Sequence, residues 1–153
     1  MKLYIMRHAQ ASFNAPSDRE RLITQLGGDQ TKELILEHAQ KLSDINMVWS
    51  SDLKRAKQTA GIVAEILGLD SAEKKFLSPD GDVRRVLSEL QGLNATDCLL
   101  VVSHQPLVGE LVGYLLDGNM QHAHPYATSE LIALELDMIE PGMASMVGQY
   151  LPT

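Results

Sequence analysis

The apolar residues of this chain form short unbroken runs, separated by longer stretches in which they recur every three or four positions. Two runs, at residues 2–6 and 98–103, are apolar almost throughout and predict buried strands. Weaker runs predict four more strands, at residues 47–50, 75–77, 130–136 and 143–150.

Between these runs the apolar spacing changes to the period of an α-helix. Ser51 or Asp52 can cap one such helix at its start, and Gly68 can end it. Gly27 and Gly28 mark a boundary in front of another. The pattern predicts four helices, at residues 29–42, 52–67, 83–93 and 106–116.

Strands that alternate with helices are typical of α/β proteins, in which helices cover both faces of a largely parallel sheet. The last two strands are joined by a turn at Pro141 and Gly142, so we expect that pair to be antiparallel. No repeat, low-complexity tract or linker interrupts the pattern. We expect a single domain over residues 1–153, a three-layer α/β/α sandwich with a mixed, mostly parallel six-stranded sheet.

Composition and charge narrow the classes of function. The 153 residues are 44% hydrophobic and 22% charged, as in ordinary globular proteins. A net charge of −7 at pH 7 argues against broad nucleic-acid binding, which needs a basic surface. We expect no membrane span and no signal peptide, and the single cysteine, Cys98, fits a reducing compartment. These features predict a cytoplasmic protein with Cys98 as an inert core thiol.

Cationic side chains stand where several predicted elements meet one edge of the sheet. Arg7 and His8 close the first strand, and His104 follows the strand at residues 98–103. The carboxyl ends of parallel strands share one edge, where open α/β sheets bind ligands. Arg55 lies in the first turn of a helix and leans toward the same edge, because helical side chains point toward the helix N-terminus.

These groups together suit a phosphate. Arginine presents a planar fork of donors to phosphate oxygens, and a neutral histidine can act as a nucleophile or base. Lys54, Arg19 and Arg21 are close enough in sequence to lie nearby. Taken singly, Arg55 is more often a solvated helix residue and His104 can be a helix cap or a hydrogen-bonded core residue. The conjunction of several such positions favours a phosphate site.

Four segments resemble motifs of the histidine phosphatase superfamily, also called phosphoglycerate-mutase-like. Arg7-His8-Ala9 resembles its Arg-His-Gly motif, and Ile-Thr-Gln-Leu-Gly at residues 23–27 resembles its Leu-Thr-x-x-Gly segment. Residues 50–60 resemble its segment Ser-(x)₃-Arg-Ala-x-Gln-Thr-Ala, and residues 101–106 its second-histidine segment. The resemblance covers essentially the whole chain. The short length and residues 81–109 are most similar to the SixA-type phosphohistidine phosphatases.

The resemblance implies a six-stranded sheet whose fifth strand is antiparallel, and it implies roles. His8 would attack phosphorus and form a transient phosphohistidine, while Arg7, Arg55 and His104 would bind the phosphoryl oxygens. Arg21 is a further candidate for binding substrate. His8 must be neutral to attack, so we expect its other ring nitrogen to donate to a backbone carbonyl. We expect no metal and no cofactor, because the cationic side chains already balance the phosphate charge.

Two departures from the family pattern bear on substrate choice. Ala9 replaces the motif glycine, and no glutamate stands where larger members keep a general acid. Asp18, Asp80 and Asp82 are the available candidates for a weak acid. An alkoxide leaving group needs a proton, whereas the imidazole of a phosphohistidine leaves more easily once solvent protonates it. The missing acid, and connections too short to form an obvious lid, favour phosphohistidine on a protein.

The sequence thus predicts a metal-independent phosphatase whose partner is a phosphorylated histidine-containing phosphocarrier or phosphotransfer protein. One alternative is a small-molecule phosphomonoesterase of the same superfamily, and another is a non-catalytic phosphate-binding module. His122 and His124 lie in a second long loop and resemble a metal-binding pair, but no ligand with suitable spacing accompanies them. They are interpreted as solvated loop residues that could line the rim of the pocket.

Overall fold

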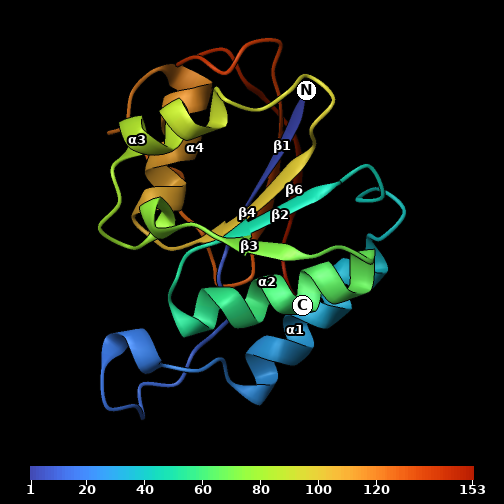
Figure 1. Ribbon diagram of the computed structural model, residues 1–153, viewed down its shortest axis with the longest axis vertical. Coiled ribbons are helices and arrows are strands. Elements are labelled where there is room, and N and C mark those ends of the chain that lie inside the picture. Colours follow the sequence, from blue (N-terminus) through green and yellow to red (C-terminus); the bar gives the residue numbers. More distant parts are fainter.

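The computed structural model describes residues 1–153, which form a six-stranded sheet with helices on both faces (Figure 1). The strands are β1 (Lys2–Arg7), β2 (Met47–Ser50), β3 (Ser71–Glu73), β4 (Leu99–Ser103), β5 (Leu131–Glu135) and β6 (Ser145–Tyr150). The α-helices are α1 (Gln25–Glu37), α2 (Lys54–Leu67), α3 (Val83–Leu90) and α4 (Leu107–Asp117), and two 3₁₀ turns span Asp18–Glu20 and Lys75–Leu77. The predicted fold class is confirmed.

The sheet has the strand order β3-β2-β4-β1-β5-β6. Strands β1 to β4 are parallel wherever they pair, whereas β5 is antiparallel to both β1 and β6. The expectation of a fifth, antiparallel strand in a mostly parallel sheet is therefore confirmed.

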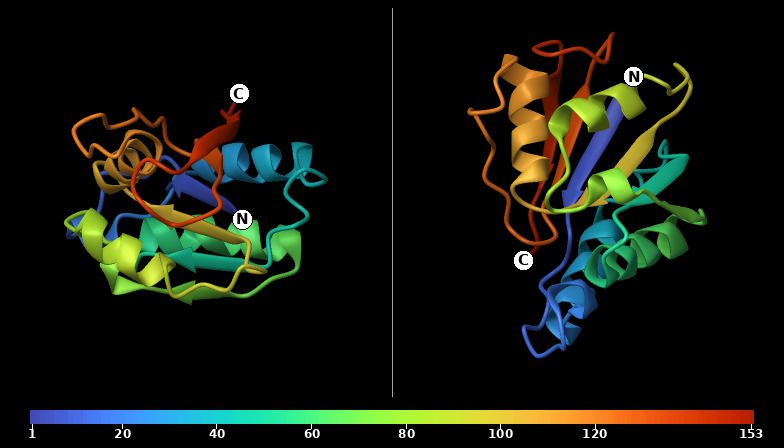
Figure 2. Two further views of the ribbon diagram at one scale, coloured as in Figure 1. Left: turned by 90° about the horizontal axis from the view of Figure 1, so that it is seen from above. Right: turned by 60° about the vertical axis from the view of Figure 1, so that its left-hand side comes forward.

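Alternating residues of the central strands enter two separate cores. Leu3 and Ile5 of β1 pack into the cluster that α3 and α4 cover, whereas Tyr4 and Met6 pack into the cluster under α1 and α2. Figure 2 shows these two helix pairs on opposite sides of the strands. A strand buried on both faces has no polar alternation, which explains the unbroken apolar runs of β1 and β4.

The pairing of β1 with β4 determines where a site can form. The two strands are parallel neighbours, and Arg7 is paired with Ser103 at their carboxyl ends. The helices that follow them, α1 and α4, lie on opposite faces of the sheet. Such a switch point leaves a crevice beyond the strand ends, which is where open α/β sheets bind their ligands.

The predicted strand at residues 75–77 is wrong. Lys75–Leu77 is a 3₁₀ turn in which Leu77 is buried. The strand in this region is instead β3 (Ser71–Glu73), which pairs with β2 at the sheet edge. All three residues of that strand are exposed. A short edge strand with no buried side chain leaves no hydrophobic pattern by which it could be found.

The boundaries predicted for the first helix are also wrong. Thr24 caps α1 by accepting from the N–H of Gly27 at 3.0 Å, so the two glycines lie inside the first turn instead of before it. A Cβ at Gly27 would stand 2.5 Å from the carbonyl oxygen of Gln10, which requires a glycine at this close approach. The helix ends at Glu37, and the residues up to Asp44 form turns over the buried Leu42.

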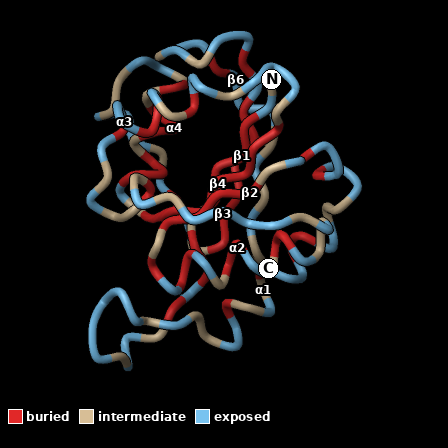
Figure 3. The backbone as a smooth tube through the Cα atoms, in the orientation of Figure 1, coloured by how far each residue is buried: buried red, intermediate tan, exposed pale blue.

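The long loop between β1 and α1 projects from the body of the molecule (Figures 1 and 2) and is largely exposed (Figure 3). A bridge between Ala11 and Ile23 closes its base, and the N–H of Ser12 donates to the carbonyl of Leu22 at 2.8 Å. The loop is therefore an ordered hairpin-like excursion beside the strand ends.

Cys98 is buried at the start of β4, as predicted, and burial raises the pKa of its thiol to about 11. None of the helices is both long enough and apolar enough to cross a bilayer.

Candidate active site

A pocket of about 290 Å³ opens where β1 and β4 end and α2 begins. Five residues singled out from the sequence line it: Arg7, His8, Arg21, Arg55 and His104. Gln10, Ala11, Phe13, Gln105 and Thr128 complete the wall. Residues distant in sequence are thus brought together as the strand topology predicts.

His8 lies at the end of β1 and is almost completely buried. Its N–H donates to the carbonyl of Ser103 at 2.9 Å, which ties it to β4. Ring Nδ1 lies 2.7 Å from the carbonyl oxygen of Ala9, and a carbonyl can only accept, so Nδ1 carries the proton. The expected hydrogen bond to a backbone carbonyl is present. The lone pair of the neutral ring is then on Nε2, the atom available for nucleophilic attack.

The pKa of His8 is lowered to about 4, mainly by burial, which the bond to Ala9 opposes and the positive charges of Arg55 and Arg7 reinforce. The pKa of His104 is lowered to about 3, mainly by burial and in smaller part by His8 and Arg55. Both rings are therefore neutral at pH 7. Their centroids are 5.0 Å apart.

His104 is held by a contact with the chain that follows β2. Its Nε2 lies 2.6 Å from the hydroxyl oxygen of Ser51, and that oxygen accepts from the N–H of Leu53 at 3.3 Å. The prediction that Ser51 or Asp52 caps α2 is wrong, because the N-cap is Leu53 and no side chain caps the helix. Ser51 instead orients the second histidine, and Asp52 pairs with Arg19.

Arg7 reaches the site from the last position of β1. Its Nη1 donates to the carbonyl of Tyr126 at 2.9 Å, and the hydroxyl of Tyr126 donates to the carbonyl of Ile5 at 2.9 Å. The loop before β5 is thereby fixed against β1. Burial lowers the pKa of Arg7, as do the charges of Arg21 and Arg55, so the three guanidinium groups repel one another. An anion between them would relieve this repulsion.

Arg55 is 4% exposed and meets Asp18 of the projecting loop. Its Nη1 donates to the backbone carbonyl of Asp18 at 2.7 Å and its Nη2 to the carboxylate at 3.1 Å. Arg21 donates to the other carboxylate oxygen at 3.2 Å. Asp18 thus bridges two of the cations that line the pocket.

Ala9 does not narrow the pocket. It is fully buried and is absent from the lining residues, and its N–H donates to the hydroxyl of Thr59 at 3.0 Å. That hydroxyl donates to the carbonyl of Arg55 at 2.7 Å. The methyl group that replaces the motif glycine is therefore accommodated inside the protein.

None of the three candidate acids has the surroundings of a neutral carboxylic acid inside the pocket. Partial burial raises the pKa of Asp18, but hydrogen bonds from Arg21 and Arg55 outweigh this effect, and its pKa is lowered overall. Asp82 caps α3 by accepting from the N–H of Arg84 at 3.0 Å. Asp80 accepts from the hydroxyl of Ser78 at 2.9 Å, and neither Asp80 nor Asp82 lines the pocket.

Sequence reasoning missed the remaining lining residues for different reasons. Gln10 and Gln105 follow the two histidines closely, so their adjacency to the strand ends was an available signal. Phe13 and Thr128 lie in loops, where no periodicity predicts which side chains face a site.

The two loop histidines behave differently from each other. His122 is exposed, as expected of a solvated residue, and its Nδ1 lies 3.5 Å from the carboxylate of Asp117. His124 is partly buried, packs edge-on against Tyr126 and lies 3.5 Å from the carboxylate of Glu130. Neither lines the pocket, and no group of three or more His, Cys, Asp or Glu side chains is arranged to hold a metal ion.

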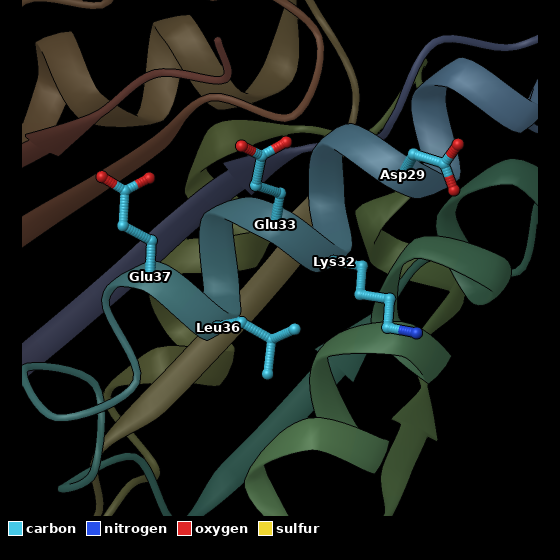
Figure 4. Close-up of a pocket in the computed structure, with 5 residues that line it drawn as sticks. All are labelled: Asp29, Lys32, Glu33, Leu36 and Glu37. Atoms are coloured by element: carbon cyan, nitrogen blue, oxygen red, sulfur yellow. The ribbon is translucent and has the colours of Figure 1, made fainter.

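A second concavity lies on the outer face of α1, away from the strand ends (Figure 4). It is lined by Asp29, Lys32, Glu33, Leu36 and Glu37. Three of these five residues are acidic, so this surface does not suit a phosphate. The arginines and histidines that suit a phosphate lie instead in the pocket at the sheet edge.

Comparison with known proteins agrees with this geometry. A model of the histidine phosphatase superfamily (branch 1) matches residues 3–78. Phosphohistidine phosphatase SixA of Escherichia coli (strain K12) is 35% identical over 141 residues, which are 90% of this chain and 86% of that protein. A SixA homolog of Haemophilus influenzae is 32% identical, over 75% of this chain and 77% of that protein. A solved structure of protein histidine phosphatase SixA complexed with tungstate has a TM-score of 0.89 and 33% identity, covering 99% of this chain and 97% of that one.

The lowered pKa values of His8 and His104 predict how both rings titrate. In the folded protein neither ring should take up a proton between pH 8 and pH 5.5, whereas an unfolded histidine titrates near pH 6.5. Between about pH 6.5 and 4 the unfolded chain then binds more protons than the native one, so the free energy of unfolding falls as the pH falls. The protonation of each ring is measured from the pH dependence of its ¹³C chemical shifts, which are assigned with the variants His8→Gln and His104→Gln. The same titration in denaturant gives the values for the unfolded chain. Titration of either native ring near pH 6.5 would contradict the prediction.

Proposed function

Because this chain belongs to the histidine phosphatase superfamily and has SixA among its relatives, we propose that it hydrolyses phosphohistidine on a protein. Its histidine-phosphatase type of activity follows from the family. The proposed substrate is a phosphorylated histidine-containing phosphocarrier or phosphotransfer protein. We further propose that His8, Arg7, Arg55 and His104 are the catalytic set and that Arg21 assists in binding substrate.

In the proposed first step, Nε2 of His8 attacks phosphorus. A new N–P bond forms on His8 while the N–P bond of the substrate breaks, and the departing imidazole takes a proton from solvent. Water then attacks the phosphoryl group on His8, inorganic phosphate leaves, and His8 returns to its neutral state. The hydrogen bond from Nδ1 to Ala9 supports this role, because it keeps the lone pair on Nε2 at pH 7.

The charge of the transferring group is met by the surrounding donors. Arg7 and Arg55 offer guanidinium groups. With the hydroxyl of Ser51 donating to Nε2 of His104, the neutral ring carries its one proton on Nδ1, a buried atom with no protein partner. These donors can stabilise the equatorial oxygens without a metal ion. Arg55 must exchange part of its contact with Asp18 for the incoming phosphoryl group. A ready-made carboxylate partner keeps this buried cation balanced while the site is empty.

The choice of substrate rests on the surroundings of Asp18, whose carboxylate accepts from Arg21 at 3.2 Å and from Arg55 at 3.1 Å. It is the one candidate acid in contact with lining residues, and its lowered pKa makes it a poor proton donor at pH 7. A general acid contributes about 10²–10⁴-fold to reactions that need one. Its lack penalises alkyl phosphates, whose leaving oxygen is strongly basic, far more than phosphohistidine.

A side-by-side substrate series tests the proposal. The expected order of kcat/KM is phosphohistidine protein first, then aryl phosphates with good leaving groups, then sugar phosphates. The rates are measured as phosphate release at one pH, after dialysis against a strong chelator and again after adding Mg²⁺ or Zn²⁺, and we expect no dependence on the ion.

Three outcomes of these measurements would overturn the proposal. Equal or faster turnover of a sugar phosphate would favour the small-molecule phosphomonoesterase, and binding of phosphate without release from any substrate would favour a non-catalytic module. Loss of activity on chelation, with recovery on adding metal, would reassign His8 and His104 as metal ligands.

Arg55 provides a second test, with its neighbour as a matched control. Arg55→Ala should lower kcat by about 10²–10³-fold, comparable to removing an oxyanion-stabilising donor. Arg55→Lys should recover little of the rate, because lysine lacks the planar fork. Lys54 precedes Arg55 in α2 but is exposed, so Lys54→Ala should retain nearly full activity. Equal damage in the Lys54 and Arg55 variants, with both folded by circular dichroism, would show that Arg55 is not the phosphate ligand.

A further inference from the structure

Phe13 is an unusual residue for the wall of a polar pocket. It is 86% exposed to solvent. The chain has only two phenylalanines, and this one is outside the hydrophobic core. A single exposed apolar side chain is ordinary on a protein surface, but an aromatic ring that lines a pocket can bind an apolar part of a ligand. Phe13 lines the same pocket as His8 and Arg55.

The position of this ring is fixed by its neighbours. The guanidinium of Arg21 lies against it, 4.0 Å from the ring centroid, and Arg21 in turn donates from Nε to the carbonyl of Ser12 at 3.0 Å. Asp18 holds Nη1 of Arg21 at 3.2 Å. The N–H of Asn14 donates to the hydroxyl of Ser12 at 3.0 Å, a bond between the two residues that flank Phe13 in the chain. The ring of Phe13 therefore packs on the guanidinium group of Arg21 and remains exposed to solvent.

The expected direction of the reaction brings the leaving group toward this ring. The attacking and leaving atoms in phosphoryl transfer are roughly in line across phosphorus. His8 lines the pocket and is only 6% exposed, so a leaving group in line with its attack points away from the protein interior, toward the solvent-exposed mouth of the pocket. Phe13, as an exposed lining residue, borders that mouth.

We propose that Phe13 is a specificity-determining residue that stacks against the imidazole ring of the phosphohistidine substrate. This inference rests on the proposed function and adds to it the contact by which an aromatic leaving group is preferred. Aromatic rings favour offset or edge-to-face pairs, and such a pair adds about 2- to 12-fold to an interaction beyond the area it buries. Phosphoramidate, which carries the same N–P bond but no ring, cannot make this contact.

The test compares free phosphohistidine with phosphoramidate, both assayed by release of inorganic phosphate. Intrinsic differences between the two leaving groups cancel when the ratio of their kcat/KM values is compared between variants. Phe13→Ala should lower this ratio by about 2- to 12-fold, and Phe13→Tyr, which keeps the ring, should restore it. Met138 is also an exposed apolar residue, in the turn between β5 and β6, and Met138→Ala should leave the ratio at its wild-type value.

The outcomes separate this inference from the proposed function. If the wild-type protein hydrolyses phosphohistidine but the ratio does not change in Phe13→Ala, the stacking contact is refuted and the proposed function stands. If both substrates lose the same factor, Phe13 serves only to support Arg21, which also refutes the contact. If the wild-type protein releases phosphate from a phosphohistidine protein but not from free phosphohistidine, the ring contact does not select the substrate and this inference alone fails. If it releases phosphate from neither, both proposals fail together.

Discussion

The parallel pairing of β1 with β4 is the constraint on which the rest of this structure depends. It ends both strands at the same level, with Arg7 opposite Ser103, so that the next residues of each strand are the two histidines of the pocket. Burial of both strands on two faces makes that register costly to change, because a slip by one residue would turn every apolar side chain to the wrong core. Strand pairing thereby brings two histidine rings within 5.0 Å of each other.

Burial and charge then act on those rings in the same direction. Both histidines are removed from water among guanidinium groups, so both stay neutral, and the carbonyl of Ala9 fixes the proton of His8 on Nδ1. The site concentrates positive charge in a protein whose net charge is −7, and Asp18 is the carboxylate that balances it while no anion is bound. A doubly charged phosphoryl group is a natural replacement for that carboxylate.

Much of this could be predicted from the sequence, for reasons that particular residues make clear. The strands and the positions of Arg7, His8, Arg55 and His104 were predictable because they depend on hydrophobic runs and on the rule that parallel strands end at one edge. Strand β3 was not predictable, since its exposed residues pair only through backbone groups. The pairing of Asp18 with Arg55 and the position of Phe13 depend on the conformation of a long loop, which no periodicity encodes.

The central claim is that a buried, neutral His8 accepts the phosphoryl group covalently, and a rapid-quench experiment tests it most directly. The protein is mixed for milliseconds with a ³²P-phosphohistidine protein, quenched into alkali, where phosphohistidine survives, and separated from its substrate. We predict that label is trapped on the wild-type chain at His8, and that His8→Ala, still folded, traps none and loses essentially all turnover. Phosphate release from the wild type with no labelled intermediate, or substantial turnover by His8→Ala, would contradict the account.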